Sequence, residues 1–152
     1  MSITHLKAGD KAPNFELKNQ DGKTISLDDY KGKKLVLYFY PKDATPGCTT
    51  QACGLRDNYE QLQKQGYEIL GVSADSEKSH QKFIAKHDLP FDLLVDDAHK
   101  MMHDYGVYGL KKFMGREYDG IHRTTFLIDE KGVISEVIKV SATKAHLGWI
   151  NN

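Results

Sequence analysis

A run of six apolar residues, Leu35–Tyr40, is followed at once by a proline-rich turn and then by a long amphipathic segment. An uninterrupted apolar run of this length is typical of a strand that is buried on both faces of a sheet. After Pro46 the apolar positions are spaced four and three residues apart, which predicts a helix with one apolar face. These positions are Cys48, Ala52, Leu55, Tyr59 and Leu62. The sequence therefore predicts a central strand that delivers the chain, through a turn beginning at Pro41, to the start of a helix.

The segments on both sides of this unit contain further strand and helix patterns. Two alternating stretches, Asn14–Lys18 and Lys23–Leu27, flank an Asp-Gly turn and predict an N-terminal β-hairpin. Later strands are expected at Tyr67–Ser73 and Phe91–Val95, and the segment between them predicts a helix over Asp75–His87.

The last third of the chain is expected to contain short elements. Asp96 or Asp97 is expected to cap a helix that ends at Tyr105, and Gly106–Gly120 is expected to be a turn-rich loop. The remaining expected elements are two strands joined by a turn and a short terminal helix, at Arg123–Ile128, Val133–Val140 and Thr143–Ile150.

The order of these elements predicts an α/β fold. Strands alternate with helices in the middle of the chain, which places helices on both faces of the sheet. The closing hairpin adds antiparallel strands, so the central β-sheet is predicted to be mixed. A thioredoxin-like architecture with an N-terminal β-hairpin fits this order, while periodicity alone leaves flavodoxin-like folds open.

The length of the chain, 152 residues, is that of one compact domain, so a single domain over residues 1–152 is expected. Lys and Arg together number 21, as do Asp and Glu, so no net charge favours nucleic acid or an anionic membrane. No apolar stretch approaches the roughly 18 residues that span a bilayer, and no signal-peptide pattern is visible. We therefore expect a cytoplasmic protein, in which two neighbouring cysteines indicate redox or metal chemistry rather than a structural disulfide.

Cys48 lies where the predicted helix begins, and this position favours a reactive thiol. A cysteine attacks as its thiolate, so a catalytic cysteine needs its anion to be stabilised. Thr45 suits the N-cap position before a proline, and Pro46 suits the first helical position. Unpaired amide hydrogens and the positive end of the helix dipole then lie beside Cys48, and Gly47 lets a substrate approach the backbone. The alternative is that Cys48 is a small apolar residue of the helix face.

Cys53 follows Cys48 by five residues. In an intact α-helix this separation gives a rise of ~7.5 Å and a Cα–Cα distance of about 8.5 Å. A disulfide needs Cα atoms closer than roughly 7 Å, so the two thiols can bond only if the first turns of the helix unwind. Gly54, which costs about 1 kcal/mol inside a helix, favours such an opening. The alternative is that Cys53 is a passive thiol on another face of the helix.

Other polar residues give weaker signals. His99 and His103 have a metal-ligand spacing, but they lack the glutamate of a His-Glu-x-x-His motif, so we interpret them as solvated histidines. A zinc site that joins Cys48 and Cys53 to a histidine is disfavoured, because Cys-x4-Cys lies outside the usual spacings. Asp43 is interpreted as a residue that caps or solvates the turn. We therefore expect no metal and no cofactor.

The segment from Tyr38 to Thr50 resembles the active-site segment of the peroxiredoxins, in particular the bacterioferritin comigratory protein, or peroxiredoxin Q, subfamily. Arg123, which begins the sequence Arg-Thr-Thr-Phe-Leu-Ile-Asp, matches the arginine that completes the site in that family. The similarity covers nearly the whole chain. The residues that match the family's Pro-x-x-x-Thr-x-x-Cys motif are Pro41, Thr45 and Cys48.

The resemblance implies a thiol-dependent peroxidase that reduces hydrogen peroxide and organic hydroperoxides. The thiolate of Cys48 would attack the peroxide and become a sulfenic acid, while Thr45, Arg123 and the Cys48 amide would hold the peroxide and stabilise the leaving oxygen. Some members have a resolving cysteine five residues further on, which matches Cys53. The disulfide would then be reduced by thioredoxin or a similar dithiol. Members of the subfamily are often monomers, so a monomer is expected.

Two parts of the chain depart from the family. Gln51 replaces a glutamate that helps to organise the site in many relatives, and the tail Ser141–Asn152 resembles the family little. Two other functions stay open beside the peroxidase. One is a thiol–disulfide oxidoreductase acting on proteins, although such enzymes use Cys-x-x-Cys. The other is a non-enzymatic redox sensor or binding module.

Overall fold

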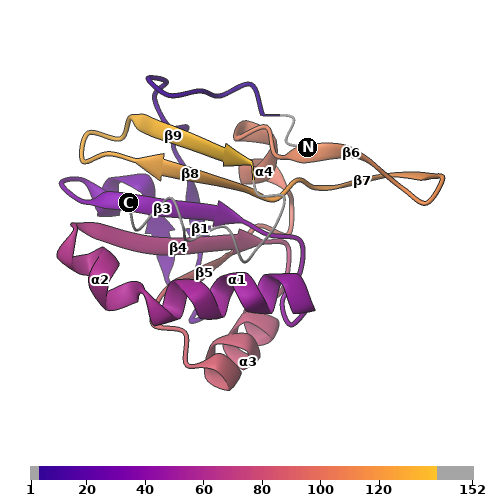
Figure 1. The fold of residues 1–152 in the computed structure, drawn as a ribbon, viewed down its shortest axis with the longest axis horizontal. Coiled ribbons are helices and arrows are strands. Elements are labelled where there is room, and N and C mark those ends of the chain that lie inside the picture. Colours follow the sequence, from indigo (N-terminus) through magenta and orange to yellow (C-terminus); the bar gives the residue numbers. More distant parts are fainter. Residues whose placement is uncertain (1–3, 140–152) are drawn as a thin grey trace.

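The computed structural model describes residues 4–139 of the chain. At its centre lies a five-stranded sheet with the strand order β5-β4-β3-β8-β9 (Figure 1). The strands are β3 (Lys34–Phe39), β4 (Tyr67–Ser73), β5 (Asp92–Val95), β8 (Thr124–Ile128) and β9 (Ile134–Lys139). β4 runs parallel to β3 and β5, whereas β8 runs antiparallel to β3 and β9. The predicted mixed sheet is confirmed.

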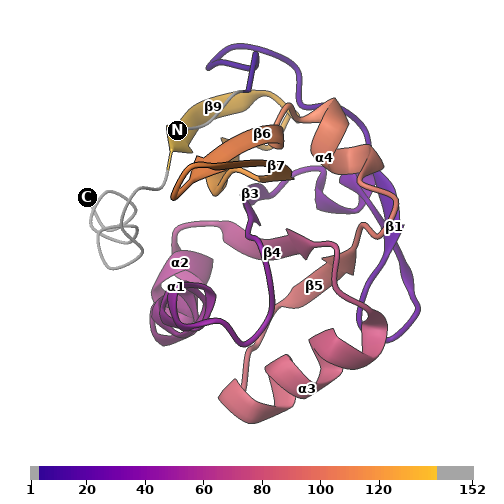
Figure 2. The same ribbon diagram turned by 90° about the vertical axis from the view of Figure 1, so that its right-hand side faces the viewer.

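Side chains of the middle strand β3 alternate between two apolar cores, as the period of a strand requires. The helices are α1 (Pro46–Asp57), α2 (Tyr59–Lys64), α3 (Glu77–His87) and α4 (Lys100–Asp104), and a 3-10 turn, η1, spans Leu27–Tyr30. Val36 and Tyr38 pack in the core that α1, α2 and α3 cover, and Leu35 and Leu37 pack in the core that α4 covers. Figure 2 shows α1 to α3 on one side of the sheet and α4 on the other. The predicted two layers of helices are therefore present.

The N-terminal hairpin is also confirmed. Strands β1 (Glu16–Lys18) and β2 (Thr24–Ser26) pair antiparallel, with Leu17 opposite Ile25, and form a separate two-stranded sheet. The helix that the sequence predicts at Thr143–Ile150 lies outside the described residues. Among residues 4–139, no helix is both long and apolar enough to cross a bilayer.

The helix predicted to follow Pro46 is divided into two. α1 ends at Asp57 and α2 begins at Tyr59, because Asn58 adopts φ −107° and ψ 7°. The Asn58 side-chain amide donates to the Gly54 carbonyl oxygen at 2.9 Å. A side chain that bonds to the backbone in this way competes with the helical hydrogen-bond ladder.

The loop expected at Gly106–Gly120 is instead largely a β-hairpin. β6 (Tyr108–Phe113) and β7 (Arg116–Ile121) pair antiparallel and project from the body of the molecule (Figure 1). Met114 and Gly115 form its two-residue turn, with φ of 51° and 80°. Both values are positive, as in a type I′ turn. The sequence prediction missed this turn because methionine stands where asparagine, aspartate or glycine is usual.

The short helix α4 starts later than the sequence predicts. It begins at Lys100 after His99, which has a positive φ of 60°. Asp96 does not occupy the N-cap position; instead its carboxylate accepts a hydrogen bond from the backbone N–H of Met102 at 2.9 Å. A buried carboxylate that precedes the helix thus accepts from an amide of its first turn, in place of a side chain at the N-cap position.

Candidate active site

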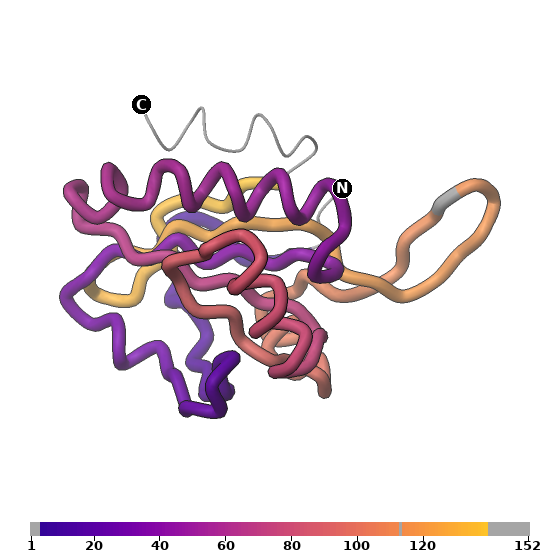
Figure 3. The backbone as a smooth tube through the Cα atoms, turned by 90° about the horizontal axis from the view of Figure 1, so that it is seen from below, coloured from indigo at the N-terminus to yellow at the C-terminus, as the bar shows by residue number. Residues whose placement is uncertain are grey.

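Cys48 lies in the first turn of α1, as predicted. Thr45 is the N-cap residue, with extended φ and ψ of −78° and 152°, and Pro46 is the first residue of the helix. Cys48 is 1% exposed and packs in the core between α1 and β3. In Figure 3 the hairpin β6–β7 leaves the body at the end of the sheet where α1 begins. The reactive end of the helix is therefore flanked by the segment that leads into β8.

Arg123 connects that segment to the cysteine. It precedes β8, and the pairing of Thr124 with Phe39 places it beside the end of β3. Its Nη2 donates to Cys48 Sγ at 3.2 Å, and its Nη1 donates to Gln51 Oε1 at 2.7 Å. The guanidinium thus places a positive charge and a hydrogen-bond donor directly at the sulfur, the atom with which a cysteine attacks. The prediction that Arg123 faces Cys48 is thus matched by the geometry.

Gln51 is buried, and its amide oxygen fixes one arm of the guanidinium fork. Its amide nitrogen has no hydrogen-bond partner among residues 4–139. Since glutamine is neutral, it orients Arg123 without sharing the positive charge that faces Cys48. Because position 51 is glutamine, the Gln51 amide nitrogen is a donor without a partner among residues 4–139, and no ion pair at this position neutralises Arg123.

A second cation, Lys111, reaches the same region from β6. Its Nζ donates to the Ile121 carbonyl oxygen at 3.0 Å. Partial burial, followed by the positive charge of Arg123, lowers the pKa of Lys111, while the charge of Cys48 acts in the opposite direction. Sequence analysis did not single out Lys111, because only the hairpin fold brings it to the cysteine.

The Thr45 hydroxyl donates to the Lys42 carbonyl oxygen at 2.9 Å rather than capping an amide of the helix. The backbone oxygen of Thr45 accepts from the Thr49 N–H at 2.8 Å. Because the single hydroxyl hydrogen is engaged, the hydroxyl oxygen presents its lone pairs as an acceptor. Pro41, half-buried, follows β3 and begins the loop that carries Thr45.

Beneath this loop lies a buried hydrogen-bond network that sequence analysis missed. Asp43 is 6% exposed, so the expectation that it solvates the turn was wrong. Its carboxylate accepts from the Tyr40 hydroxyl at 2.6 Å and from the Ser79 hydroxyl at 2.8 Å, and it lies 2.7 Å from Nδ1 of His80. His80 shares the inward face of α3 with Phe83, and a histidine on an apolar helix face is the signal that could have revealed the network.

The protons of this network can be counted. His80 Nε2 lies 2.8 Å from the Leu94 carbonyl oxygen, and since a carbonyl only accepts, Nε2 carries a hydrogen. One further proton is then shared between Nδ1 and the Asp43 carboxylate. Asp75 completes the cluster by accepting from the Asp43 backbone N–H at 2.7 Å. Asp43, Asp75 and His80 present ligand-type atoms within 4.8 Å of one another, but these hydrogen bonds engage the facing atoms, so we interpret the cluster as a clamp on the loop.

Two buried tyrosines pack against the same loop. Burial, followed by the charge of Cys48, raises the pKa of Tyr38 well above its ordinary value. Burial also raises the pKa of Tyr40, with Tyr38 and Asp43 adding to the effect. Their rings are stacked, with centroids 5.3 Å apart. Both phenols thus stay neutral and form an apolar wall beside the thiol.

Cys53 lies five residues along the same uninterrupted helix, and both thiols are free. It is half-buried, and its sulfur lies 3.6 Å from Nδ1 of His87 on α3. A bond between the two cysteines therefore requires α1 to open, as the helical geometry predicts.

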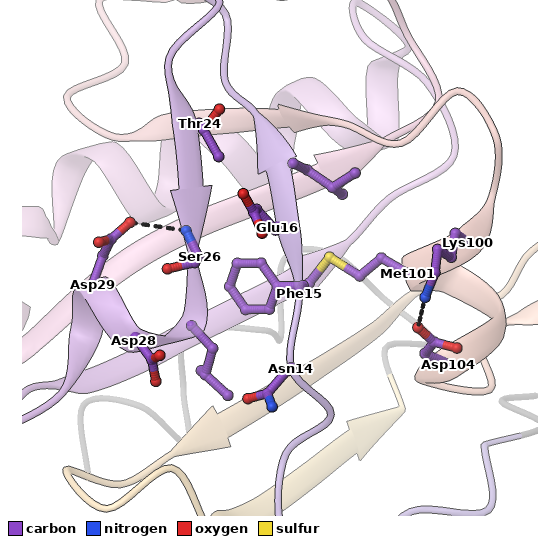
Figure 4. A pocket seen from close by; sticks show the side chains of 12 residues that line it. Asn14, Phe15, Glu16, Thr24, Ser26, Asp28, Asp29, Lys100, Met101 and Asp104 are labelled. Carbon is purple, nitrogen blue, oxygen red and sulfur yellow. Dashed lines mark hydrogen bonds and ion pairs between the residues drawn. The ribbon is translucent and has the colours of Figure 1, made fainter.

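A cavity of about 570 Å³ lies elsewhere, between the N-terminal hairpin and α4 (Figure 4). Phe15 and Met101 are among the apolar residues that line it, and Asp28, Asp29 and Asp104 are among the charged ones. None of the residues that surround Cys48 lines it. A peroxide group is only two oxygen atoms across, so the chemistry at Cys48 does not need a cavity of this size.

Comparison with known proteins identifies the family. A sequence profile of the AhpC/TSA family matches residues 8–137. The chain belongs to the AhpC/TSA family. Peroxiredoxin Bcp of Escherichia coli K12 is 48% identical over 149 residues, which cover 95% of this chain and 96% of the relative. Peroxiredoxin Bcp of Bacillus subtilis 168 is 51% identical over 142 residues, which cover 93% and 90%.

A solved structure of the Xanthomonas campestris bacterioferritin comigratory protein, studied for its alkyl peroxide reduction activity, superposes with a TM-score of 0.84. It is 34% identical and covers 90% of this chain and 87% of its own. The resemblance to the Bcp and peroxiredoxin Q subfamily and the thioredoxin-like fold are confirmed. As a peroxiredoxin, the protein is a thiol-dependent peroxidase. This decides against the two alternatives, a thiol–disulfide oxidoreductase acting on proteins and a non-enzymatic redox sensor or binding module.

Proposed function

We propose that this peroxiredoxin reduces hydrogen peroxide and organic hydroperoxides in a two-cysteine cycle, with Cys48 as the peroxidatic thiol and Cys53 as the resolving thiol. The observation that carries the proposal is the 3.2 Å hydrogen bond from Arg123 to the Cys48 sulfur. A guanidinium in that position stabilises the attacking thiolate. The activity on alkyl peroxides named for the Xanthomonas relative supports organic hydroperoxides as substrates.

In the first step, the Cys48 thiolate attacks the terminal oxygen of the hydroperoxide. The O–O bond breaks, Cys48 becomes a sulfenic acid, and the other oxygen departs as water or an alcohol after it takes a proton. Arg123 and the Cys48 amide stabilise the charge that develops on the departing oxygen. The Thr45 hydroxyl oxygen accepts the peroxide hydrogen, and Pro41 turns the chain from β3 so that Thr45 lies above the helix end.

In the second step, the first turns of α1 open and Cys53 attacks the sulfenic acid. A disulfide forms and water departs. The opening also exposes a disulfide whose Cys48 sulfur is buried in the reduced protein. An exposed disulfide is open to exchange with thioredoxin or a similar dithiol, which we assign as the reductant.

We also assign the chain as a monomeric, cytoplasmic protein whose residues 1–152 form one peroxiredoxin domain. The two free thiols fit a reducing compartment. The family match over residues 8–137 supports a single domain. Sedimentation velocity of the reduced protein tests the monomer, and a species of twice the mass of 17.2 kDa would contradict it.

The deciding experiment is the intact mass of fully reduced protein before and after one equivalent of hydrogen peroxide. Loss of two hydrogens, with both thiols restored by thioredoxin, is the expected result. The Cys48→Ser variant should consume no peroxide, whereas Cys53→Ser should stop at the sulfenic acid. Peroxide consumption by Cys48→Ser at the wild-type rate would refute the assignment of Cys48. Gain of oxygen without a disulfide in the wild type would refute the role of Cys53.

A further inference from the structure

Cys53 is paired with a histidine of the neighbouring helix. Its sulfur lies 3.6 Å from Nδ1 of His87, the last residue of α3. Both side chains are half-buried. The ring of Phe83 meets the imidazole edge-on, with centroids 5.3 Å apart, and so restricts its orientation. The contact thus joins a thiol to an imidazole nitrogen that packing holds in place.

Arg56 ties the same two helices together. Its Nη1 donates to the His87 carbonyl oxygen at 2.8 Å, and its Nε donates to Asp57 at 2.9 Å. The half of α1 that carries Cys53 is therefore anchored to the end of α3. The half that carries Cys48 is held instead by Arg123. An opening that begins at the N-terminus of α1 brings Cys48 toward a Cys53 that remains beside His87.

We propose that His87 is the general base for Cys53 in the resolution step. This inference rests on the proposed function, because it takes Cys53 as the resolving thiol. In this mechanism Cys48 changes position when the first turns of α1 open, whereas Cys53 stays in contact with His87.

The chemistry needs no other reagent. His87 Nδ1 takes the hydrogen of the Cys53 thiol as the Cys53 sulfur attacks the sulfur of the Cys48 sulfenic acid. The S–S bond forms while the S–O bond breaks. The departing hydroxide takes the proton from His87 and leaves as water. The Cys53 sulfur is oxidised and the Cys48 sulfur is reduced, so atoms and electrons balance.

The proposed role makes the step depend on pH. The imidazole can accept a proton only while Nδ1 is unprotonated, and histidine ordinarily changes charge between about pH 5 and 8. An unassisted cysteine thiol ionises near pH ~8.5. Assisted resolution therefore keeps its rate at lower pH than unassisted resolution. The charged groups that interact around Cys53 have mixed sign: they are Arg56, Asp57 and Asp88. Lys86 precedes His87 in the chain, and the buried Tyr38 phenol, whose pKa is raised, is neutral.

The test compares wild-type protein with the His87→Phe and His87→Gln variants after reduced protein is mixed with one equivalent of hydrogen peroxide. Rapid acid quenching and intact-mass measurement separate the sulfenic acid from the disulfide. We expect Cys48 oxidation to keep its rate and disulfide formation to be roughly tenfold slower at pH 7, because only a few per cent of an unassisted thiol is ionised there. The pH profile should shift upward, and added imidazole should restore part of the rate.

His103→Gln is the matched control, because His103 is exposed on α4, across the sheet from α1. Circular dichroism of each reduced variant verifies its fold, and the Phe variant keeps an aromatic ring against Phe83. An unchanged rate and pH profile in both His87 variants would overturn the role of His87 but leave the two-cysteine cycle intact. A wild-type protein that forms no Cys48–Cys53 disulfide would overturn the proposed function itself.

Discussion

Arg123 places a positive charge beside the Cys48 sulfur at the start of α1. One arm of its fork reaches the Cys48 sulfur and the other reaches the Gln51 amide oxygen. A glutamate at position 51 would form an ion pair with the guanidinium and compete with the thiolate for its charge. The neutral glutamine fixes the same geometry and leaves the charge to the sulfur.

Replacing Arg123 by glutamine should slow the oxidation of Cys48 by about 100-fold. The variant removes a charged donor from the developing oxygen anion, and the loss of one such donor typically has this effect. Stopped-flow measurement of the first oxidation step with hydrogen peroxide gives the rate. Arg116→Gln, on the exposed part of β7, is the control and should keep the wild-type rate. A full rate in Arg123→Gln would show that the arginine is not part of the reaction.

Replacing Asp43 by alanine should lower the free energy of unfolding by about 3 kcal/mol. The substitution leaves the Tyr40 and Ser79 hydroxyls and His80 Nδ1 buried without their shared acceptor, and loss of one partner of a buried charged pair is costly. Urea denaturation of the reduced protein measures the effect. Asp119→Asn, an exposed change on β7, should leave the midpoint in place. Equal midpoints for Asp43→Ala and wild type would mean that the network adds no stability.

The proposed two-cysteine cycle depends on the first half of α1. This segment holds Cys48 in the reduced state, and it must open for the disulfide to form. Its sequence lowers the free-energy cost of opening, because Gly47, Thr49 and Thr50 are weaker helix formers than alanine. The second half is tied to α3 through Arg56. The packing therefore favours opening at the end that carries Cys48, the proposed peroxidatic thiol.

Thr50 offers a direct test of this opening, because it is exposed and lies between the two cysteines. Alanine at this position should slow disulfide formation and glycine should speed it, since the two differ by about 1 kcal/mol in helix stability. The two variants should therefore differ about fivefold in the rate that follows Cys48 oxidation. The same substitutions at Lys82, exposed on α3, serve as the control. Identical rates for Thr50→Ala and Thr50→Gly would argue that this turn stays folded.

At the scale of the whole molecule, the sheet and its two cores hold several phenols in their neutral form. Burial raises the pKa of Tyr30, Tyr38, Tyr40 and Tyr105 above the ordinary value. Burial, followed by a hydrogen bond to Glu68, raises the pKa of Tyr59 to about 12. These side chains lie in different elements, so their ionisation is coupled to the folding of the entire domain.

The protein should lose stability as the pH rises above about 10. Unfolded tyrosines release their protons near pH 10, while the folded chain retains them, so above that pH the unfolded state binds fewer protons and becomes favoured. Each fully buried tyrosine contributes a slope of about 1.4 kcal/mol per pH unit in this range. Urea denaturation at rising pH should show this fall, with tyrosinate absorbance appearing together with the loss of circular dichroism.

Tyr118→Phe is the control for this alkaline denaturation, because Tyr118 is 47% exposed on β7 and its removal should leave the fall in stability unchanged. Full tyrosinate absorbance from all eight tyrosines in a protein that retains its native circular dichroism would contradict the coupling.

Local patterns in the sequence determined several secondary-structure elements of this protein. The apolar run at β3, the proline at the start of α1 and the Asp-Gly turn of the first hairpin each act through neighbouring residues, and so could be recognised in isolation. Helical geometry also fixed the separation of Cys48 and Cys53, and with it the need for α1 to open. Arg123 was assigned only through the family motif, because its own surroundings along the chain resemble an exposed strand end.

Tertiary structure alone decided which distant side chains meet. The pairing of β8 with β3 brings Arg123 to Cys48, and the packing of α3 on the sheet brings His80 under Asp43 and His87 to Cys53. The strands β6 and β7 escaped prediction because their turn uses Met114, whose positive φ is supported by cross-strand pairing rather than by its residue type. Contacts between residues more than thirty positions apart depend on strand register and helix packing, and no short stretch of sequence contains that information.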